Sequence, residues 1–323
     1  MDYLGATLFS LPALATALDL LLGDPHRLPH PVRAIGAFLA YLEPRARAWG
    51  LPLRLAGALC VLLTAGFCAG LVYLLLRVPL LGGAVALYLA YAGLALGQLV
   101  KEGRRALRLI ESGAESGDLS AEMNAAREAV GFLVSRDTSA LGPEELRRTL
   151  AETLSENLGD GFVCPLFYLV LAGPVGLWAY KAVSTMDSMW GYKTERYREL
   201  GWACARLDDA LAYLPARLTA GLLILAGLCL GLDWRSALAR TARDARRMES
   251  PNAGWPMAAS AWLLGAGMGG AAVYFGEVKM KPVLGPEGQP WRPEILSRLL
   301  RLLVIAGLFA LFGFTSLRYL LLP

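Results

Sequence analysis

The chain has 323 residues, of which 56% are hydrophobic and 18% are charged, and its formal net charge is +4. Soluble domains carry about 25% charged residues, and the mean hydropathy here is +0.46, which together exclude an ordinary soluble enzyme. The positive charge comes mostly from arginines near the ends of apolar segments. No basic run is interleaved with aromatic residues, so we expect no binding to nucleic acid.

Four stretches are predicted to span a bilayer, because a spanning helix requires about 20 mostly apolar residues. They cover roughly residues 3–22, 55–76, 80–100 and 299–322. Arginine-rich connections follow the first and third stretches, which predicts that both connections are cytoplasmic. Since apolar blocks recur along the whole sequence, we expect residues 1–323 to form a single integrated, multi-pass domain of the cell (inner) membrane.

Two further apolar blocks, at residues 162–179 and 218–232, are ambiguous. The first is interrupted by Gly173 and Pro174, and the second is barely long enough to span. Broken helices at membrane depth are tolerated where they line a protein cavity, which favours re-entrant or broken helices here. The Gly- and Ala-rich block at 258–275 has the same ambiguity.

The portion between about 101 and 160 is predicted to be helical and cytoplasmic. Asp118 is expected to cap a helix that runs from Leu119 to about Val134. A second helix is expected to begin at Pro143, because proline favours the first helical position, and to end at Gly159. Strand patterns are not evident, so the sequence predicts an all-α, polytopic integral membrane protein.

The middle of the chain, about 136–217, concentrates ionisable residues close to apolar blocks. Glu152 and Glu156 share a helix face, Asn157 is adjacent, and Asp160 follows the expected end of the helix. Like charges at this spacing repel, and Mg²⁺, which takes one or two carboxylates plus substrate phosphates, would relieve the repulsion. A solvated helix face is the alternative.

Lys181 and Asp187 lie between two weakly hydrophobic stretches. They either form a structural ion pair, or Lys181 binds a phosphate while Asp187 serves as metal ligand or general base. A second cluster, which surface salt bridges would also explain, consists of Arg206, Asp208, Asp209 and Arg217.

Two loops complete the set of candidate segments. Residues 250–256 have the composition of a turn, and a simple connector is the alternative to a binding loop. His30 follows a Pro-rich loop, where it would either contact an anionic ligand or stabilise the turn. The chain has no GxxxxGK[ST] motif, so a P-loop nucleotide site is excluded.

Taken in order, these motifs resemble the CobD/CbiB family of cobalamin-biosynthesis membrane proteins, the adenosylcobinamide-phosphate synthases. The motifs are Leu18-Asp19, Gly23-Asp24-Pro25, His30-Pro31-Val32, Arg136-Asp137-Thr138, Glu152 to Asn157, Asp160-Gly161, Pro165-Leu166-Phe167, Tyr180-Lys181, Thr185-Met186-Asp187-Ser188-Met189, Gly191-Tyr192, Arg206-Leu207-Asp208-Asp209, Pro215-Ala216-Arg217 and Ser250-Pro251-Asn252-Ala253-Gly254-Trp255-Pro256. The chain departs from the family pattern at Ser184, where Asn is usual, and at Met257, where Glu is common.

The resemblance implies an amide-forming enzyme. The propionate of adenosylcobyric acid, a corrinoid that is substrate and not prosthetic group, would be joined to (R)-1-aminopropan-2-ol or its phosphate, with ATP and magnesium expected. Catalytic roles fall to Glu152, Glu156, Asp187 and Asp208. Metal binding falls to Glu156, Asp160, Asp187 and Asp209. Substrate binding falls to Lys181, Arg206, Arg217, Asn157, Asn252, Trp255, His30 and Arg136.

Two other functions compete with this one. Polar residues and broken helices also mark the translocation sites of transporters, although transporter halves usually show related hydropathy and this chain shows none. A non-catalytic membrane scaffold for corrinoid enzymes is the third hypothesis. We expect a site that faces the cytoplasm, and homo-oligomers or complexes with other corrinoid-pathway membrane enzymes remain open as partners.

Overall fold

The computed structural model describes residues 2–24, 29–118, 120–274 and 276–321. Four positions named above, Pro25, Leu119, Phe275 and Leu322, lie outside these ranges. Over the described residues the elements are α1 (Asp2–Leu22), α2 (Pro31–Ala48), α3 (Leu53–Leu76), α4 (Gly82–Gly93), α5 (Leu96–Ser116), α6 (Ala121–Gly131), α7 (Pro143–Leu158), the π-helical segment η1 (Gly159–Val163), α8 (Cys164–Trp190), α9 (Trp202–Cys229), α10 (Trp234–Ala245), α11 (Gly254–Leu264), β1 (Met268–Tyr274), β2 (Glu277–Leu284) and α12 (Pro293–Leu321).

Five helical segments within the described residues are long and apolar enough to cross a membrane. They are Leu53–Leu76, Gly82–Ser116, Pro143–Trp190, Trp202–Cys229 and Pro293–Leu320. The predicted class, a helical polytopic membrane protein, is therefore confirmed. Both ambiguous blocks, 162–179 and 218–232, fall largely in such helices, and α1 contains the apolar stretch Ser10–Leu22.

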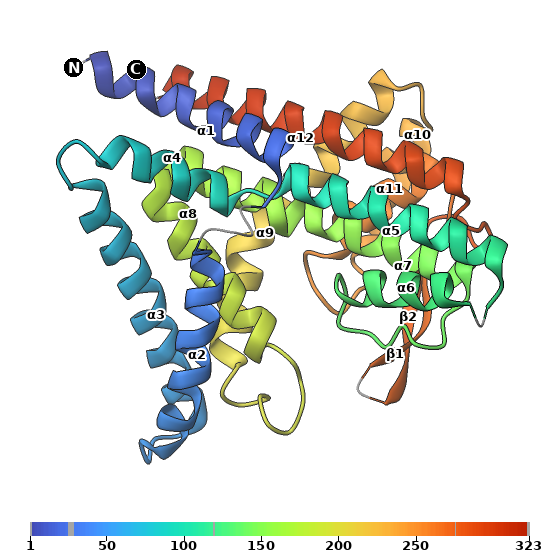
Figure 1. Ribbon diagram of the computed structural model, residues 1–323, viewed down its shortest axis with the longest axis horizontal. Helices are drawn as coiled ribbons and strands as arrows, with labels where there is room; N and C mark the ends of the chain where they lie inside the picture. The colour runs from blue at the N-terminus through green and yellow to red at the C-terminus, as the bar shows by residue number, and fades with distance from the viewer. Residues whose placement is uncertain (1, 25–28, 119, 275, 322–323) are drawn as a thin grey trace. The chain divides into compact units, whose positions relative to one another are not determined.

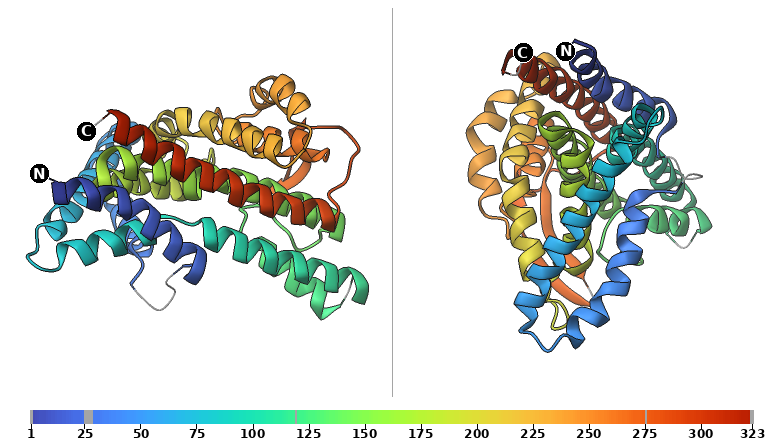
Figure 2. Two further views of the ribbon diagram at one scale, coloured as in Figure 1. Left: turned by 90° about the horizontal axis from the view of Figure 1, so that it is seen from above. Right: turned by 90° about the vertical axis from the view of Figure 1, so that its left-hand side faces the viewer.

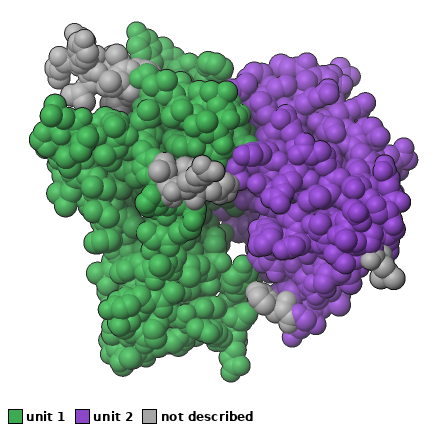
Figure 3. Space-filling view, in the orientation of Figure 1, with its two compact units in different colours: residues 1–97, 160–213, 311–323 green, residues 98–159, 214–310 purple. Residues whose placement is uncertain are grey.

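The chain divides into two compact units, coloured in Figure 3. Unit 1 comprises Met1–Gly97, Asp160–Tyr213 and Leu311–Pro323, and unit 2 comprises Gln98–Gly159 and Leu214–Ala310. Within unit 1, α3 packs against α2, α4 and α8 (Figure 1). Within unit 2, α10 packs against α11, and the β1–β2 hairpin contacts α7, α10 and α11 (Figure 2). That the whole chain acts as one membrane domain stays a prediction.

Helix α8 is broken in its middle, as the Gly-Pro pair indicates. Ala172 and Gly173 have non-helical backbone angles, and Gly173 has a φ of 64°. Pro174 has no amide hydrogen to donate to the carbonyl of Val170, four residues earlier. Arg318 of α12 donates to that carbonyl instead, so the polar group freed by the break has a partner inside unit 1.

The β1–β2 hairpin was not predicted, and the expectation of a chain without strands was wrong here. The strands pair antiparallel, with an irregularity between Met268 and Gly270. A Cβ on Gly269 would lie 2.1 Å from the carbonyl oxygen of Pro282, so glycine permits the close approach. The block 258–275 is not one continuous helix, because α11 ends at Leu264 and its C-cap, Gly265, has a φ of 68°.

Of the two helices predicted between about 101 and 160, one begins and ends as predicted and the other has a different N-cap. Helix α7 begins at Pro143 and is followed by Gly159, as the sequence predicts. Helix α6 is capped by Ser120, whose Oγ accepts from the Met123 amide at 3.0 Å, and not by Asp118. Asp118 instead forms an ion pair with Arg127.

Candidate functional site

Hydrogen bonds from aromatic side chains join α8 to α9 and to α4 in unit 1, and two rings of α8 stack on each other. The rings of Tyr168 and Tyr180 stack with centroids 5.0 Å apart. The Tyr168 hydroxyl donates to the carbonyl of Leu211 at 2.9 Å, which ties α8 to α9. The indole of Trp178 donates to the Leu89 carbonyl at 3.0 Å and so ties α8 to α4. These contacts fix the backbone from which the ionisable side chains project.

Lys181 is the centre of a charged cluster in this part of unit 1. It is half-buried, and it interacts electrostatically with Asp160 from η1, Asp208 from α9 and Asp24 from the turn after α1. A lysine at membrane depth normally has an acidic partner. The sequence indicates Asp187 as a candidate ion-pair partner of Lys181. The three carboxylates found near Lys181 in the structure are instead those of Asp160, Asp208 and Asp24.

Asp187 and Asp208 are neighbouring carboxylates in the same cluster, and their charges repel each other. Asp187 interacts electrostatically with Asp209, and Asp208 interacts with Asp187, Asp209 and Lys181. A Cβ on Gly191 would lie 2.0 Å from Asp187 Oδ1, so the glycine at this position leaves room for the carboxylate. Oδ1 of Asp208 is buried and has no hydrogen-bond partner among the described residues. Neighbouring carboxylates and an unpartnered oxygen are features that a bound cation would stabilise.

The predicted metal ligands are divided between the two units. Asp160, Asp187 and Asp209 belong to unit 1, and Glu156 belongs to unit 2. Among the described residues, no three His, Cys, Asp or Glu side chains are arranged to hold a metal ion. Two carboxylates are nevertheless enough for Mg²⁺ when substrate phosphates complete its ligands, so the donor set fits this ion and the assignment stays a prediction.

Glu152 of unit 2 has both oxygens satisfied. Oε2 accepts from the Arg136 guanidinium, and Oε1 accepts from the backbone amide of Gly269 at 2.7 Å. Arg136 also donates to Thr149 at 3.2 Å, and its guanidinium carbon lies 5.8 Å from the centroid of the Tyr274 ring. Glu152 and Arg136 thus join α7 to β1, and their catalytic and substrate-binding roles stay predictions.

Two other predicted residues of α7 differ in their surroundings. Glu156 is half-buried and interacts electrostatically with Lys281, Glu152 and Arg136. The Asn157 side chain donates to the carbonyl and the hydroxyl of Thr153, at 2.9 and 3.0 Å. Its amide nitrogen is therefore engaged within its own helix, and its substrate-binding role stays a prediction.

A third group brings together residues that are far apart in the sequence. Arg217 of α9 donates to Asn252 Oδ1 and to the carbonyl of Pro251, both at 3.4 Å. Its guanidinium carbon lies 4.6 Å from the centroid of the Trp255 ring. The predicted turn therefore ends at Ala253, since Gly254 to Pro256 belong to α11, and Arg217 contacts both the turn and the start of this helix. The substrate-binding roles of Arg217, Asn252 and Trp255 stay predictions. Arg206 is not part of this group; it is exposed and interacts with Asp209 in unit 1.

His30 has the turn-stabilising role that the sequence left open. Nδ1 accepts from the Val32 amide at 3.3 Å, which caps α2, and Nε2 lies 3.1 Å from Asp24 Oδ1. Burial lowers the pKa of His30, and the charges of Lys181 and Arg33 act in the same direction, against the opposing effect of Asp24. Its substrate-binding role stays a prediction.

Sequence reasoning missed several residues of these sites. Asp24 and Lys281 were not selected, although Asp24 follows a glycine directly after an apolar helix and Lys281 lies in an alternating stretch of β2. A buried network around Glu43 was also missed. Glu43 accepts hydrogen bonds from Arg47, Arg196 and Tyr197 at 2.9–3.1 Å.

The fold and these sites define a polytopic membrane protein that holds ionisable side chains inside and beside apolar helices. A family model described as CobD/Cbib protein matches residues 12–303. The chain is 39% identical over 312 residues to the cobalamin biosynthesis protein CobD of Listeria monocytogenes serovar 1/2a, covering 94% of this chain and 96% of that protein. The chain therefore belongs to the CobD/CbiB family.

Other relatives show similar coverage. Cobalamin biosynthesis protein CobD of Pelobacter propionicus is 41% identical over 293 residues, which is 88% of each chain. Cobalamin biosynthesis protein CbiB of Salmonella paratyphi A is 38% identical over 317 residues, covering 94% of this chain and 96% of that protein. No solved structure matches the chain significantly.

Proposed function

We propose that this protein acts in cobalamin biosynthesis, where it joins the propionate carboxylate of adenosylcobyric acid to (R)-1-aminopropan-2-ol or its phosphate. The product is adenosylcobinamide or adenosylcobinamide phosphate. The family match over residues 12–303 carries the proposal. The relatives that this chain matches over nearly their whole length are named cobalamin biosynthesis proteins. The cluster of Lys181 with its aspartates supplies groups suited to the chemistry.

The proposed reaction has two steps, since a carboxylate is a poor electrophile. First, a propionate oxygen attacks the γ-phosphorus of ATP, and ADP leaves with the electron pair of the broken P–O bond. The amine, deprotonated by a base, then attacks the carbonyl carbon of the acyl phosphate, and inorganic phosphate leaves. One acid, one amine and one ATP thus give one amide, ADP, phosphate and a proton.

The residues of unit 1 are assigned by their charge and surroundings. Lys181 offsets the negative charge of the transferred phosphate. Asp187 or Asp208 accepts the proton from the ammonium form of the amine. When bound, Mg²⁺ would neutralise phosphate charge, and its proposed ligand is whichever carboxylate of Asp187 and Asp208 does not act as the base. In unit 2, Arg217, Trp255 and Asn252 are a separate group of proposed substrate-binding residues.

One assay tests the proposal against its alternatives. Purified protein is mixed with adenosylcobyric acid, aminopropanol phosphate, ATP and magnesium, and amide and ADP are measured by mass spectrometry. The enzyme is expected to form both in equal amounts. A transporter or a scaffold forms no amide, and amide without ADP would retain the reaction while excluding the acyl phosphate. Asp187→Ala is expected to abolish product formation while the protein stays folded; wild-type rates in that variant would refute the role.

The cytoplasmic orientation of the site is part of the proposal, because ATP is intracellular. Glu195 is exposed and lies in the irregular connection between α8 and α9. Glu195→Cys is placed in a Cys229→Ala background, since Cys229 is the one exposed cysteine. A membrane-impermeant maleimide is expected to label inverted vesicles but not intact cells. Labelling of intact cells above that of the Cys229→Ala parent would contradict the orientation.

A further inference from the structure

Helix α10 and the turn that follows it carry five exposed arginines in unit 2. They are Arg235, Arg240, Arg243, Arg246 and Arg247. The opposite side of the helix packs against α11 and β2 and buries Ala237, Thr241, Asp244 and Ala245. Residues 233–247 contain five arginines, two aspartates and no other charged residue, which gives a net charge of +3. None of these residues was assigned a role in the reaction.

A tight turn keeps the start of α10 close to the end of α9. Helix α9, which is long and apolar enough to cross a membrane, ends at Cys229, and α10 begins at Trp234. Gly231 has a φ of 67°, and the amide of Leu232 donates to the carbonyl of Gly227 at 2.9 Å, so the chain turns directly at the end of α9. Five residues span at most about 18 Å. The first turn of α10 therefore lies near the level at which the headgroups of a bilayer begin.

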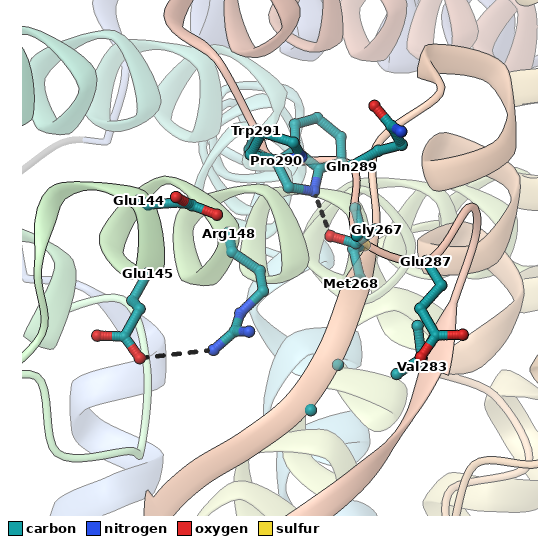
Figure 4. Close-up of a pocket in the computed structure, with 13 residues that line it drawn as sticks. Glu144, Glu145, Arg148, Gly267, Met268, Val283, Glu287, Gln289, Pro290 and Trp291 are labelled. Carbon is teal, nitrogen blue, oxygen red and sulfur yellow. Dashed lines mark hydrogen bonds and ion pairs between the residues drawn. The ribbon is translucent and has the colours of Figure 1, made fainter.

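Two of the five arginines turn toward neighbouring elements. The guanidinium carbon of Arg240 lies 4.5 Å from the centroid of the Trp262 ring in α11. Arg247 donates to the carbonyl of Val283 at 3.2 Å, at the edge of a small cavity that Glu287 also lines (Figure 4). The other three arginines are spaced for one side of the helix. We call this side the cationic face and define it by Arg235, Leu238, Ala239, Arg243 and Arg246.

Apolar side chains accompany the arginines of the cationic face. Leu238 is 64% exposed and lies one helical turn from both Trp234 and Arg235. The guanidinium carbon of Arg235 lies 5.4 Å from the centroid of the Trp234 ring. A short helix that presents arginines together with tryptophan and leucine is typical of the membrane interface. The exposed leucine thus favours lipid over a soluble polyanion, because it adds nothing to a phosphate site in water.

Carboxylates offset only part of the charge on the cationic face. Oδ1 of Asp244 accepts from Nε of Arg243 at 3.2 Å, and Asp233 interacts electrostatically with Arg235. Arg235 and Arg246 donate no side-chain hydrogen bond to any described residue. A guanidinium presents five N–H donors, so these two arginines can bind phosphate oxygens from outside the protein.

We propose that the cationic face of α10 binds the anionic headgroups of the bilayer that α9 crosses. Arg235 and Arg246 donate to lipid phosphates, and Leu238 enters the boundary between headgroups and acyl chains. Unit 2 is thereby held against the membrane surface. The proposal does not rest on the ligase reaction, because lipid binding requires neither a corrinoid nor ATP.

A fluorophore placed on the cationic face tests the proposal on the full chain. Ala239→Cys is introduced in a Cys229→Ala background, since Cys229 is the one exposed cysteine, and is labelled with an NBD maleimide. The protein is placed in phosphatidylcholine nanodiscs that contain a small fraction of doxyl-labelled phosphatidylglycerol or, separately, doxyl-labelled phosphatidylcholine. The anionic probe is expected to quench at least twofold more than the zwitterionic probe. High salt is expected to abolish the difference.

Equal quenching by the two probes would overturn the proposal. If the probes quench equally but the NBD emission changes on addition of ATP, the face binds a soluble polyanion instead. The labelled Cys229→Ala parent without the Ala239→Cys change supplies the background signal.

Matched variants test the assigned arginines. Arg235→Gln/Arg246→Gln is expected to lose the preference for the anionic probe, whereas Arg198→Gln/Lys279→Gln, which removes two exposed cations from other segments, is expected to retain it. Loss of the preference in both double variants, or in neither, would contradict the assignment. Should Arg235→Gln/Arg246→Gln fail to fold, each single variant is expected to lose about half of the preference, and an undiminished preference in both would contradict it equally.

Discussion

Two groups of charged side chains, one in each unit, differ in how their polar atoms are satisfied. In unit 2, each oxygen of Glu152 accepts a hydrogen bond, one from Arg136 and one from the backbone of Gly269. In unit 1, a buried oxygen of Asp208 accepts none within the described part of the chain, and its charged neighbours include Asp187. Both oxygens of the Glu152 carboxylate are hydrogen-bonded, although Nε of Arg136 has no hydrogen-bond partner among the described residues. A buried acceptor without a hydrogen bond, such as Asp208 Oδ1, lowers the free energy of unfolding by about 1–3 kcal/mol. Such a cost is expected to persist where function requires the group.

The largest expected change in stability follows from breaking the buried ion pair of Arg136 and Glu152. Glu152→Ala leaves the Arg136 guanidinium, whose side chain is 7% exposed, without its carboxylate. An uncompensated buried charge destabilises by about 3–5 kcal/mol, which corresponds to a fall in Tm on the order of 10 °C. Scanning fluorimetry of the purified protein in detergent measures it.

The matched control for this prediction removes both charges. Arg136→Met/Glu152→Met is expected to recover most of the lost Tm, because no buried charge remains unpaired. A Glu152→Ala protein with the wild-type Tm would show that the ion pair does not maintain the fold.

For Asp208, we expect a loss of activity without a loss of stability. Asp208→Asn keeps the shape but removes the charge, so amide formation is expected to fall about 100-fold or more, as for loss of a general base. The Tm is expected to stay the same or to rise, since the variant removes charge repulsion from Asp187. Glu195→Gln, an exposed acid of the same unit, serves as control and retains the wild-type rate. A large fall in Tm for Asp208→Asn would assign Asp208 to the fold and not to the reaction.

The local features of the fold were predictable from the sequence. Pro143 at the first position of α7 and the Gly173-Pro174 break of α8 follow from backbone stereochemistry alone. The hairpin was missed because the Gly- and Ala-rich sequence of β1 is equally suited to helix packing in a membrane. Its signal lay in β2, where Val278 and Met280 alternate with Lys279 and Lys281.

The sites were less predictable, because the residues that form them bond to residues that are distant in the sequence. Spacing placed Glu152 on a helix face but could not reveal that the Gly269 amide, 117 residues later, binds its carboxylate. The carbonyl of Val170 required a partner once Pro174 was present, yet nothing local indicated Arg318, 148 residues away. The acidic and basic residues were recognisable from the sequence, whereas their hydrogen-bond and ion-pair partners are set by tertiary contacts.

A smaller, pH-dependent effect is expected at Glu43 of α2. Burial raises its pKa, but hydrogen bonds from Arg196, Arg47 and Tyr197 outweigh burial, so the pKa of Glu43 lies below its ordinary value of 4.5. A lowered folded-state pKa contributes stability above the unfolded pKa and loses it as the pH falls through the folded pKa. Glu43→Gln is expected to lower stability by about 2 kcal/mol at pH 7. The difference from wild type, measured by Tm from pH 7 to pH 3, should shrink below about pH 4.5. A difference that is constant over this range would contradict the charged network.

The smallest effect is expected for a satisfied pair that is not buried. Arg54 and Glu199 lie 2.7 Å apart, with side chains 58% and 43% exposed. Exposed pairs contribute about 0.2–1 kcal/mol, so a double-mutant cycle of Arg54→Gln and Glu199→Gln should give a coupling in this range that vanishes at high salt. Arg54 also lies over the Trp202 ring at 5.5 Å, and the cycle separates that contact from the ion pair. A coupling as large as that of Arg136 with Glu152 would mean that hydrogen-bond satisfaction alone, without burial, determines which charges maintain the fold.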